Sequence, residues 1–137
     1  MIEEAAAFAE RVHRGTFRKG TTIPYIVHPM ETAVIVSGFT DEEEMIAAAL
    51  LHDVVEDAGV TGEELEARFG NRVKELVLAE SEDKSKSWEQ RKAFTLSHLA
   101  DSSRDVKILA LGDKMCIRDR CWEAAEPLRS PVFPHLL

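Results

Sequence analysis

The sequence predicts an all-α fold in which several helices pack across one another as an orthogonal bundle. Three observations support this prediction. Apolar residues recur at helical spacing along almost the whole chain, several segments begin with helix-capping residues, and the alternation typical of strands is nearly absent. With 137 residues, the chain can bury about two-thirds of its unfolded surface and fold as one domain without a stabilising metal ion.

The first half of the chain contains three predicted helices. Alanines and other apolar residues at helical spacing mark the first, over about residues 2–12. The glycine- and proline-containing segment RGTFRKGTTIPYIVHP predicts a loop, and Pro29 suits the first turn of a second helix that continues to about residue 39. Thr40 and Asp41, followed by glutamates, predict the capped start of a third helix that carries the segment LLHDVVED.

The second half contains four further predicted helices. The pairs Thr61–Glu64 and Ser87–Gln90 have the spacing of capping boxes and open two of them. The first of these ends at a glycine, and a helix over about residues 72–80 follows it. The polar segment SEDKSKS predicts a loop, the next helix extends to about residue 100, and RDVKILALGDKM predicts the last one.

The composition, with 45% hydrophobic and 31% charged residues, is typical of a soluble globular protein. A net charge of −8 argues against broad binding to nucleic acids or anionic membranes, although a small anionic substrate stays compatible with local cations. The chain shows neither a long apolar run nor a signal peptide, so a cytoplasmic protein is expected. Cys116 and Cys121 have no CxxC spacing, which argues against a disulfide framework or a zinc ribbon.

Four polar residues directly follow the apolar run MIAAALL: His52, Asp53, Glu56 and Asp57. At about 100° per residue, these side chains share one arc of a helix surface. The preceding residues are apolar on every side, which predicts a buried helix, and unpaired carboxylates there would cost several kcal/mol each. The alternative is that the helix emerges into solvent after Leu51 and the four residues form its exposed end.

Two residues elsewhere in the chain could join this cluster. His28 opens the second helix, and Asp113 interrupts the apolar segment ILALGDKM, where a charge needs a partner. Two imidazoles and two carboxylates suit a divalent ion such as Mn²⁺, Fe²⁺ or Zn²⁺. Taken singly, either residue is more often a hydrogen-bonded structural residue than a ligand, so both interpretations stay open.

Four motifs occur in order along the chain: FRKGTTIPYIVHP, AAALLHDVVEDAGVT, RFGNRVKELV and SRDVKILALGDKM. With this order, residues 3–115 resemble the HD-domain superfamily, and within it the hydrolase domain of RelA/SpoT-type proteins and their small stand-alone relatives. The resemblance implies an all-helical HD fold and hydrolysis of the 3′-pyrophosphate of guanosine tetraphosphate or pentaphosphate, (p)ppGpp. It also implies that one Mn²⁺, or another divalent ion, is held by His28, His52, Asp53 and Asp113.

The resemblance assigns roles to four further residues. Glu56 and Asp57 would position or deprotonate the attacking water, and Arg18 and Lys19 would line the pocket for the base. A carboxylate one helical turn from His52, as Glu56 is, lies within reach of a water molecule at the ion. The planar guanidinium of Arg18 can stack on a purine while it donates hydrogen bonds.

A run of cations in SEDKSKSWEQRK suits the negative charge of a pyrophosphate group. It contains Lys84, Lys86, Arg91 and Lys92 in an otherwise acidic chain. Lys84 and Arg91 are the predicted substrate contacts. The alternative is that the run is simply the solvated start of a helix.

The sequence departs from the family pattern just after Asp113. That pattern continues as DKxSNLR, with an asparagine that helps to hold the nucleotide, whereas Ile117 stands at this position. The string MCIRDR also resembles the translation of sequencing-adaptor DNA. We therefore expect an HD phosphohydrolase domain over residues 1–115, truncated at its C-terminus. An atypical tail over residues 116–137, for which a non-native origin is one interpretation, should pack poorly from about residue 120.

Two classes of function follow from the sequence. One is a metal-dependent hydrolase of (p)ppGpp or a close nucleotide, which the intact HDxxED motif favours. The other is an HD module that binds metal or nucleotide without turnover, which the lost asparagine and the atypical tail favour. In both, the expected partner is a small nucleotide and not a nucleic acid or a membrane, and the sequence does not define the oligomeric state.

Overall fold

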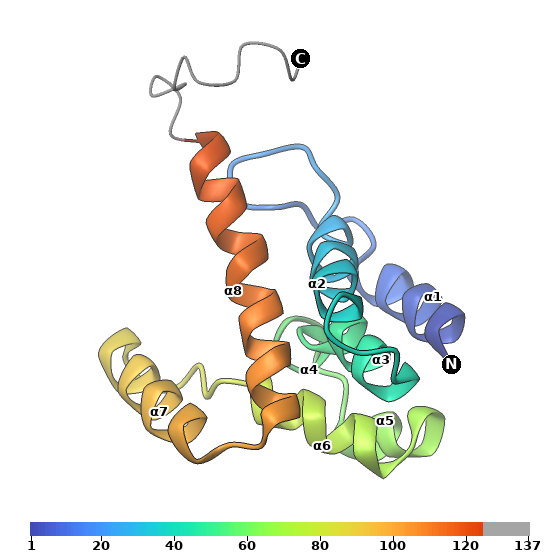
Figure 1. Cartoon of the computed structure of the whole chain (residues 1–137). Coiled ribbons are helices and arrows are strands. Elements are labelled where there is room, and N and C mark those ends of the chain that lie inside the picture. Colours follow the sequence, from blue (N-terminus) through green and yellow to red (C-terminus); the bar gives the residue numbers. More distant parts are fainter. Residues whose placement is uncertain (125–137) are drawn as a thin grey trace.

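The computed structural model describes the backbone of residues 1–124 and the side chains of residues 1–116, and this part of the chain is helical and without strands (Figure 1). In chain order the helices are α1 (Ile2–His13), α2 (Val27–Ser37), α3 (Glu43–Leu51), α4 (Val54–Ala58), α5 (Gly62–Phe69), α6 (Asn71–Glu80), α7 (Trp88–Asp101) and α8 (Arg104–Ala124). The all-α prediction is therefore confirmed. Within the described residues, every helix is too short or too polar to cross a membrane. The predicted poor packing of the tail concerns side chains that lie outside the described residues.

Side-chain caps begin two helices where the sequence predicts them. Ser87 Oγ accepts a hydrogen bond from the Gln90 N–H at 3.2 Å, and Gln90 Oε1 accepts one from the Ser87 N–H at 3.1 Å, which completes the capping box of α7. Thr61 Oγ1 caps α5 by accepting from the Glu64 N–H at 3.2 Å, but the Glu64 carboxylate accepts a hydrogen bond from Arg68. The capping box predicted for α5 is only half formed.

The third predicted helix is interrupted. Helix α3 starts shortly after the predicted cap and ends at Leu51. His52 and Asp53 then form a turn, and α4 follows. Asp53 has φ −96° and ψ −7°, in the bridge region and not the regular helical range. The assumption of one continuous helix through these polar residues is therefore wrong, and the shared arc of the four side chains stays a prediction.

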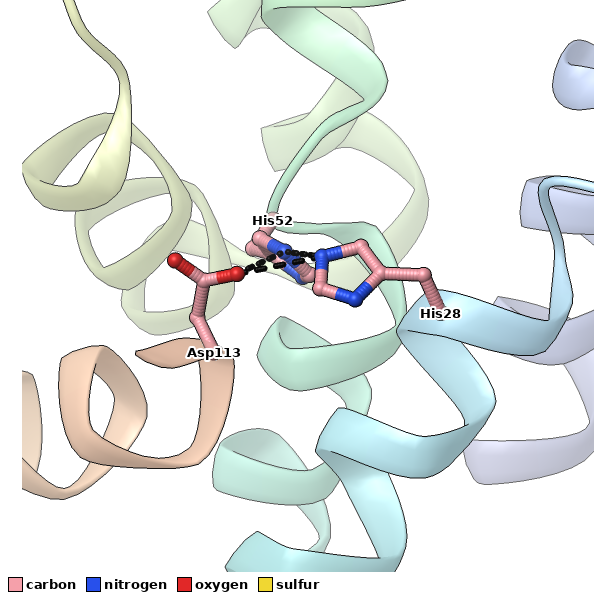
Figure 2. Close-up of side chains that lie close together, drawn as sticks. All are labelled: His28, His52 and Asp113. Carbon is pink, nitrogen blue, oxygen red and sulfur yellow. Dashed lines mark hydrogen bonds and ion pairs between the residues drawn. The ribbon is translucent and has the colours of Figure 1, made fainter. Parts of the chain in front are cut away.

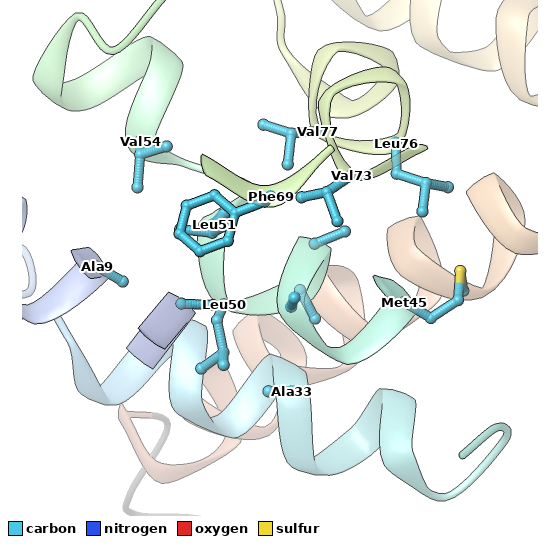
Figure 3. Packing of buried hydrophobic residues seen from close by; sticks show 14 of the residues in the cluster. Ala9, Ala33, Met45, Leu50, Leu51, Val54, Phe69, Val73, Leu76 and Val77 are labelled. Atoms are coloured by element: carbon cyan, nitrogen blue, oxygen red, sulfur yellow. The ribbon is translucent and has the colours of Figure 1, made fainter. Parts of the chain in front are cut away.

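Helix α3 forms the centre of the hydrophobic core. Its buried residues include three consecutive alanines, 47–49, and Leu50 and Leu51, and α1, α2, α6 and α8 pack around it. Figure 3 shows Leu50 and Leu51 in one cluster with side chains from α5 and α6, such as Phe69 and Val77. The small alanine side chains allow the surrounding helices to approach closely. The core therefore holds the C-terminal end of α3, with His52, in a fixed position.

Helix α8 packs against α2 (Figure 1), and Gly112 lies at the contact. A Cβ atom at Gly112 would lie 2.9 Å from Val36 Cγ2 and 3.4 Å from the backbone oxygen of Thr32. Glycine therefore allows a helix contact that any larger residue would disturb. This contact places the next residue, Asp113, beside the end of α3.

Helix α7 lies to one side of the bundle (Figure 1), and none of its residues is buried. A polar cluster connects it to the segment after α6. Glu82 Oε1 lies 3.1 Å from Thr95 Oγ1 and 3.4 Å from Lys92 Nζ, and Glu82 Oε2 lies 3.4 Å from Arg91 Nη1. This helix is held mainly by partly exposed polar contacts and not by the core.

Candidate metal centre

Two histidines and two aspartates from separate parts of the chain converge beside the core. His28 lies in the first turn of α2, His52 and Asp53 follow α3, and Asp113 lies on α8. The Nε2 atoms of His28 and His52 are 3.2 Å apart. Asp113 Oδ1 lies 3.1 Å from His28 Nε2 and 3.4 Å from His52 Nε2 (Figure 2). Asp53 Oδ2 lies 3.4 Å from His28 Nε2 and 3.1 Å from His52 Nε2. The structure thus brings the four predicted ligands together.

These separations fit the ligands of a single divalent ion. Bonds of about 2.1 Å place neighbouring ligand atoms about 3.0–3.4 Å apart when the bond angles lie between about 90° and 109°. Within the described side chains, His28, His52 and Asp113 form a buried group whose donor atoms all lie within 4.8 Å of one another. Imidazole nitrogens combined with carboxylate oxygens suit Mn²⁺, Fe²⁺ or Zn²⁺. The residues present are therefore chemically able to hold such an ion.

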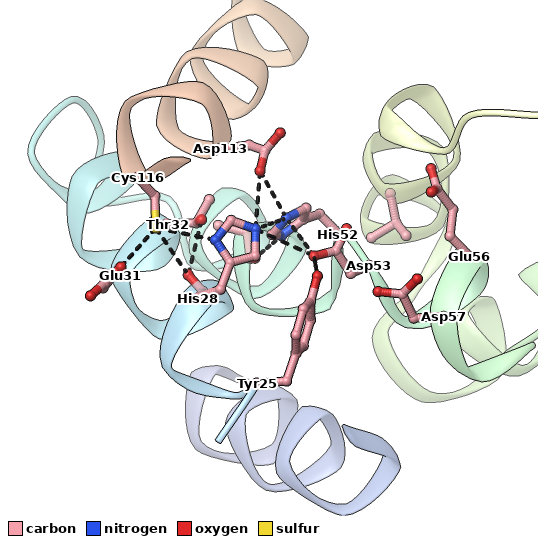
Figure 4. A network of polar contacts seen from close by, with 12 residues as sticks. Tyr25, His28, Glu31, Thr32, His52, Asp53, Glu56, Asp57, Asp113 and Cys116 are labelled. Carbon is pink, nitrogen blue, oxygen red and sulfur yellow. Dashed lines mark hydrogen bonds and ion pairs between the residues drawn. The ribbon is translucent and has the colours of Figure 1, made fainter. Parts of the chain in front are cut away.

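The Nδ1 atom of each histidine has a hydrogen-bond partner on the side of the ring that faces away from the cluster. His52 Nδ1–H donates to the Ala49 carbonyl at 2.7 Å, and His28 Nδ1 lies 3.1 Å from Cys116 Sγ (Figure 4). With a proton on Nδ1, each neutral imidazole has its lone pair on Nε2. Both lone pairs therefore point toward the carboxylates, as metal binding requires.

Each aspartate also has an outer partner. Tyr25 donates its hydroxyl hydrogen to Asp53 Oδ2 at 2.6 Å, and Lys114 Nζ lies 2.6 Å from Asp113 Oδ2. Asp113 can therefore pair with Lys114 through one oxygen and face the histidines through the other. Such outer contacts orient metal ligands and limit their motion.

Burial and close pairing shift the pKa values of the cluster in opposite directions. Burial alone would lower the pKa of His52, but hydrogen bonds to Asp113 and Asp53 outweigh it and raise the pKa to about 10. The same carboxylates raise the pKa of His28 against its burial. Burial likewise opposes ionisation of both aspartates, yet hydrogen bonds from the two histidines lower the pKa of each carboxyl. The carboxylates thus favour positive charge at this point, from protons or from a metal ion.

Glu56 and Asp57, the predicted catalytic residues, contact the segment that follows α6. The Glu56 carboxylate accepts a hydrogen bond from the backbone N–H of Glu82, and Asp57 Oδ1 lies 2.7 Å from Lys84 Nζ. Burial raises the pKa of Glu56 although the Glu82 N–H lowers it, and nearby Asp53 raises it further. The structure therefore joins these two acids to one predicted phosphate contact, Lys84, and their catalytic role stays a prediction.

The other predicted substrate contacts lie at two separate places. Arg18 and Lys19 belong to the loop between α1 and α2, where the Arg18 N–H donates to the Ile23 carbonyl at 2.9 Å. Among the described residues, the buried Nη1 of Arg18 has no hydrogen-bond partner, whereas Lys19 is exposed. Arg91 pairs with Glu82, as described for α7. Their predicted contacts with base and phosphate stay predictions.

The family of the chain follows from a comparison with known domains. The model of a family described as HD domain matches residues 5–111, which include His28, His52 and Asp53 and end two residues before Asp113. The chain belongs to the HD-domain family. The resemblance based on the four sequence motifs is therefore confirmed.

Relatives of this HD domain include named enzymes. The chain is 40% identical over 119 residues to the guanosine-3′,5′-bis(diphosphate) 3′-pyrophosphohydrolase MESH1 of Xenopus tropicalis, and 42% identical over 118 residues to that of Homo sapiens. These matches cover 84% and 82% of this chain but 66% and 64% of the relatives, so the chain spans just under two-thirds of their length. A protein with the same enzyme name from Aquifex aeolicus is 33% identical over 136 residues, which are 96% of this chain and 19% of that protein.

Two solved structures resemble this HD domain. A metazoan orthologue of SpoT, described as hydrolysing ppGpp, superposes with a TM-score of 0.81 and 35% identity over 86% of this chain and 68% of its own. The protein lmo0812 from Listeria monocytogenes EGD-e superposes with a TM-score of 0.70 and 36% identity, over 74% and 65% of the two chains. The expected HD fold is confirmed.

Three residues around the centre of this HD domain were not predicted from the sequence. Tyr25 stands three residues before His28 in the segment PYIVH, and this spacing was the available signal. Lys114 is adjacent to a predicted ligand, so its position in the sequence could also have drawn attention. Cys116 was assigned to the atypical tail, yet it is 2% exposed and contacts His28. Its role depends on the packing of α2 and α8, for which the sequence contains no signal.

A hollow lies next to the centre, between α6, α7 and α8. Its lining includes Glu80, Glu82, His98 and Lys114. Burial raises the pKa of Glu80 to about 7, although Lys114 opposes this shift. A second hollow of about 200 Å³, lined by Arg91 among others, opens beside it. The lining of both hollows is mainly apolar, with charged side chains such as Lys114 in the first and Arg91 in the second.

Proposed function

We propose that this HD domain is a metal-dependent phosphohydrolase that removes the 3′-pyrophosphate from guanosine tetraphosphate or pentaphosphate. The observation that carries the proposal is the meeting of His28, His52, Asp53 and Asp113 at separations of 3.1–3.4 Å. The enzyme name shared by relatives from animals and a bacterium supports the choice of substrate. The partner is thus a small nucleotide, in a protein that we expect in the cytoplasm.

Mn²⁺ is the ion that we propose for this centre, because the resemblance to RelA/SpoT-type hydrolases implies it and the two carboxylates suit it. The two histidines would bind through Nε2, and Asp53 and Asp113 through one carboxylate oxygen each. When bound, a divalent ion lowers the pKa of a water molecule and supplies positive charge beside phosphate oxygens.

Glu56 is the proposed proton acceptor. Hydrolysis joins the water oxygen to the phosphorus that carries the 3′-oxygen, breaks the bond between that phosphorus and the 3′-oxygen, and delivers a proton to the released oxygen. Burial raises the pKa of Glu56, which makes its carboxylate a stronger proton acceptor. Asp57, adjacent in sequence and paired with Lys84, is proposed to position the water.

Cations on two sides are proposed to hold the nucleotide. Lys84 and Arg91 would contact its phosphates, and each is at present paired with a carboxylate that a phosphate oxygen could join or replace. Arg18 and Lys19 would line the base pocket. The planar guanidinium of Arg18 can stack on guanine, and its Nη1 is available as a donor within the described structure.

A second candidate function is binding of metal or nucleotide without turnover. Ile117 stands where the family pattern has a nucleotide-holding asparagine, and this departure favours the second candidate. An isoleucine side chain cannot form the hydrogen bonds of an amide. The metal centre itself is compatible with both candidates.

Incubation of the purified protein with ppGpp and Mn²⁺ tests the proposal. We expect GDP and pyrophosphate in equal amounts, and no product when a chelator replaces the metal. A panel containing pppGpp, GTP and other nucleotides would show whether the activity is selective. Metal binding without product from any nucleotide would favour the second candidate.

Two variants separate metal binding from proton transfer. His52→Ala should lose stoichiometric Mn²⁺ in elemental analysis because an Nε2 ligand is removed. Glu56→Gln should retain the metal but lose turnover by roughly 100-fold or more, because an amide keeps the shape and cannot accept the proton. Full metal content in His52→Ala, or full activity in Glu56→Gln, would contradict the corresponding assignment.

A further inference from the structure

Cys116 and Glu31 form a row of contacts with His28, on the side of its ring away from the other proposed metal ligands (Figure 4). Cys116 Sγ lies 3.1 Å from His28 Nδ1, and Glu31 Oε2 lies 2.7 Å from Cys116 Sγ. Cys116 is 2% exposed and His28 is 4% exposed, so their contact is largely shielded from water, whereas the contact with Glu31 is partly buried. Glu31 and His28 belong to α2 and Cys116 to α8, so the packing of two helices assembles the group.

The chemistry of the three groups sets the direction of their hydrogen bonds. An ionised carboxylate can only accept, so the thiol donates its hydrogen to Glu31. The sulfur of Cys116 then accepts the Nδ1–H of His28. This arrangement places the imidazole lone pair on Nε2, the atom that faces Asp53 and Asp113.

We propose that Cys116 and Glu31 are positioning residues that hold His28 with Nε2 directed at the metal. The inference rests on the metal centre of the proposed function, and it concerns a residue just beyond the predicted domain boundary. His52 has a comparable support in the Ala49 carbonyl, so both imidazoles are oriented from behind. The carboxylate of Glu31 also strengthens the acceptor character of the sulfur by polarising its S–H bond.

Substitutions at position 116 test the inference directly. Cys116→Ala removes the acceptor for Nδ1–H and should weaken Mn²⁺ binding roughly 10–100-fold, measured by competition with a chelating dye. Cys116→Ser keeps a group that both accepts and donates, and serine is the residue of the DKxSNLR pattern at this position. It should bind Mn²⁺ within about threefold of the parent.

Substitutions of Glu31 provide an independent test. Glu31→Ala should weaken Mn²⁺ binding more than Glu31→Gln does, because the amide oxygen can still accept the S–H hydrogen. The matched control is Glu63→Gln, which changes an exposed glutamate of α5 and should leave the affinity unchanged. The melting temperature of each variant shows whether a loss of affinity merely reflects loss of the fold.

A readout that does not depend on hydrolysis is the NMR signal of the His28 Nδ1–H. In the parent and in Cys116→Ser, this hydrogen should be protected from exchange in both metal-free and Zn²⁺-loaded protein. In Cys116→Ala, the Nδ1 hydrogen of His28 should exchange faster in both the metal-free and the Zn²⁺-loaded protein. A merely structural role of Cys116 would alter the melting temperature without this selective change at His28.

The outcomes distinguish this inference from the proposed function. Parental Mn²⁺ affinity in a folded Cys116→Ala protein would overturn the inference, as would equal losses in the alanine and serine variants. If Cys116→Ala does not fold, parental Mn²⁺ affinity in Glu31→Ala would overturn the inference. If the variants behave as expected but the parent hydrolyses no nucleotide, the positioning role stands and the proposed function fails. If the parent binds no divalent ion, the positioning role fails as well.

Discussion

At the scale of single residues, Tyr25 shows how one hydroxyl can order a proposed metal ligand, Asp53. Its hydroxyl donates to Asp53 Oδ2 at 2.6 Å, and the centroids of its ring and the His13 ring are 4.9 Å apart. Burial, together with the nearby Asp53 carboxylate, raises the pKa of Tyr25 well above its ordinary value. Tyr25 therefore remains a hydrogen-bond donor at every pH at which the protein would work.

Tyr25→Phe should weaken metal binding about tenfold, because Asp53 loses the contact that orients its carboxylate. The free energy of unfolding should fall by about 1.5–3 kcal/mol, the usual contribution of a hydrogen bond to a charged group. Dye competition and chemical denaturation measure the two effects. Ser37→Ala, which removes an exposed hydroxyl at the end of α2, is the control and should bind metal like the parent. Unchanged affinity in Tyr25→Phe would show that Asp53 needs no support from the hydroxyl.

At the scale of helices, the position of Asp113 depends on how closely α8 approaches α2. Gly112 permits this approach, since an added Cβ would lie 2.9 Å from Val36 Cγ2. Glycine normally destabilises a helix interior by about 1 kcal/mol relative to alanine. The contact with α2 reverses this preference at Gly112.

Gly112→Ala should therefore lower the free energy of unfolding by about 1–3 kcal/mol, as overpacking does, and weaken metal binding by displacing Asp113. Val36→Ala should partly rescue it, so that the double variant is more stable than the sum of the single effects predicts. Gly62→Ala is the matched control, because its Cβ would meet Leu78 Cδ1 at an ordinary 3.4 Å. A Gly112→Ala protein more stable than the parent would contradict the close contact.

Helix α7 illustrates a different kind of attachment. None of its residues is buried, and Glu82 joins it to the body through partly exposed contacts with Arg91, Lys92 and Thr95. Contacts of this kind contribute little individually, because water screens them. The end of the molecule that carries a predicted phosphate contact is therefore less firmly held than the metal centre.

Hydrogen exchange followed by mass spectrometry should show α7 exchanging much faster than α3, whose residues are largely buried. Glu82→Ala should accelerate exchange in α7 further and leave α3 unchanged. Glu89→Ala, an exposed substitution on α7 itself, controls for the loss of a negative charge. Equal protection of α3 and α7 would mean that α7 is bound to the body more firmly than its contacts indicate.

At the scale of the whole molecule, a partly buried acid, Glu80, makes stability depend on pH. Burial raises the pKa of Glu80 from an ordinary value of 4.5 to about 7. The folded protein therefore binds this proton more tightly than the unfolded chain does. Glu80 contributes this stability below about pH 4.5, and the contribution is lost as the pH rises to about 7 and above.

Glu80→Gln should consequently stabilise the protein at pH 8, by about 1–3 kcal/mol, because the amide remains neutral where the carboxyl must ionise. At pH 4.5 the two proteins should have nearly equal stability. Chemical denaturation across this pH range measures the difference, and Glu63→Gln serves as the exposed control. An equal effect of Glu80→Gln at both pH values would show that the ionisation of Glu80 is not its cause.

The sequence by itself determined the helical class, most helix boundaries and the family. These properties depend on residues a few positions apart. The pair Ser87–Gln90 caps α7 through contacts three residues apart, and the apolar run before His52 builds the central helix. The HDVVED segment likewise marks the centre through neighbouring residues. Such local patterns can be read without knowledge of how the helices pack.

Only the tertiary structure decided how the polar side chains of this centre are directed. The turn at Asp53 ends α3, and the Glu56 carboxylate accepts a hydrogen bond from the N–H of Glu82, 26 positions along the chain. Cys116 contacts His28 across 88 positions, because α8 packs against α2 with Gly112 at the contact. The hydrophobic pattern of each helix shows which face is buried, but it does not show which neighbour covers that face. Packing of separate helices therefore decides which side chains orient the proposed ligands.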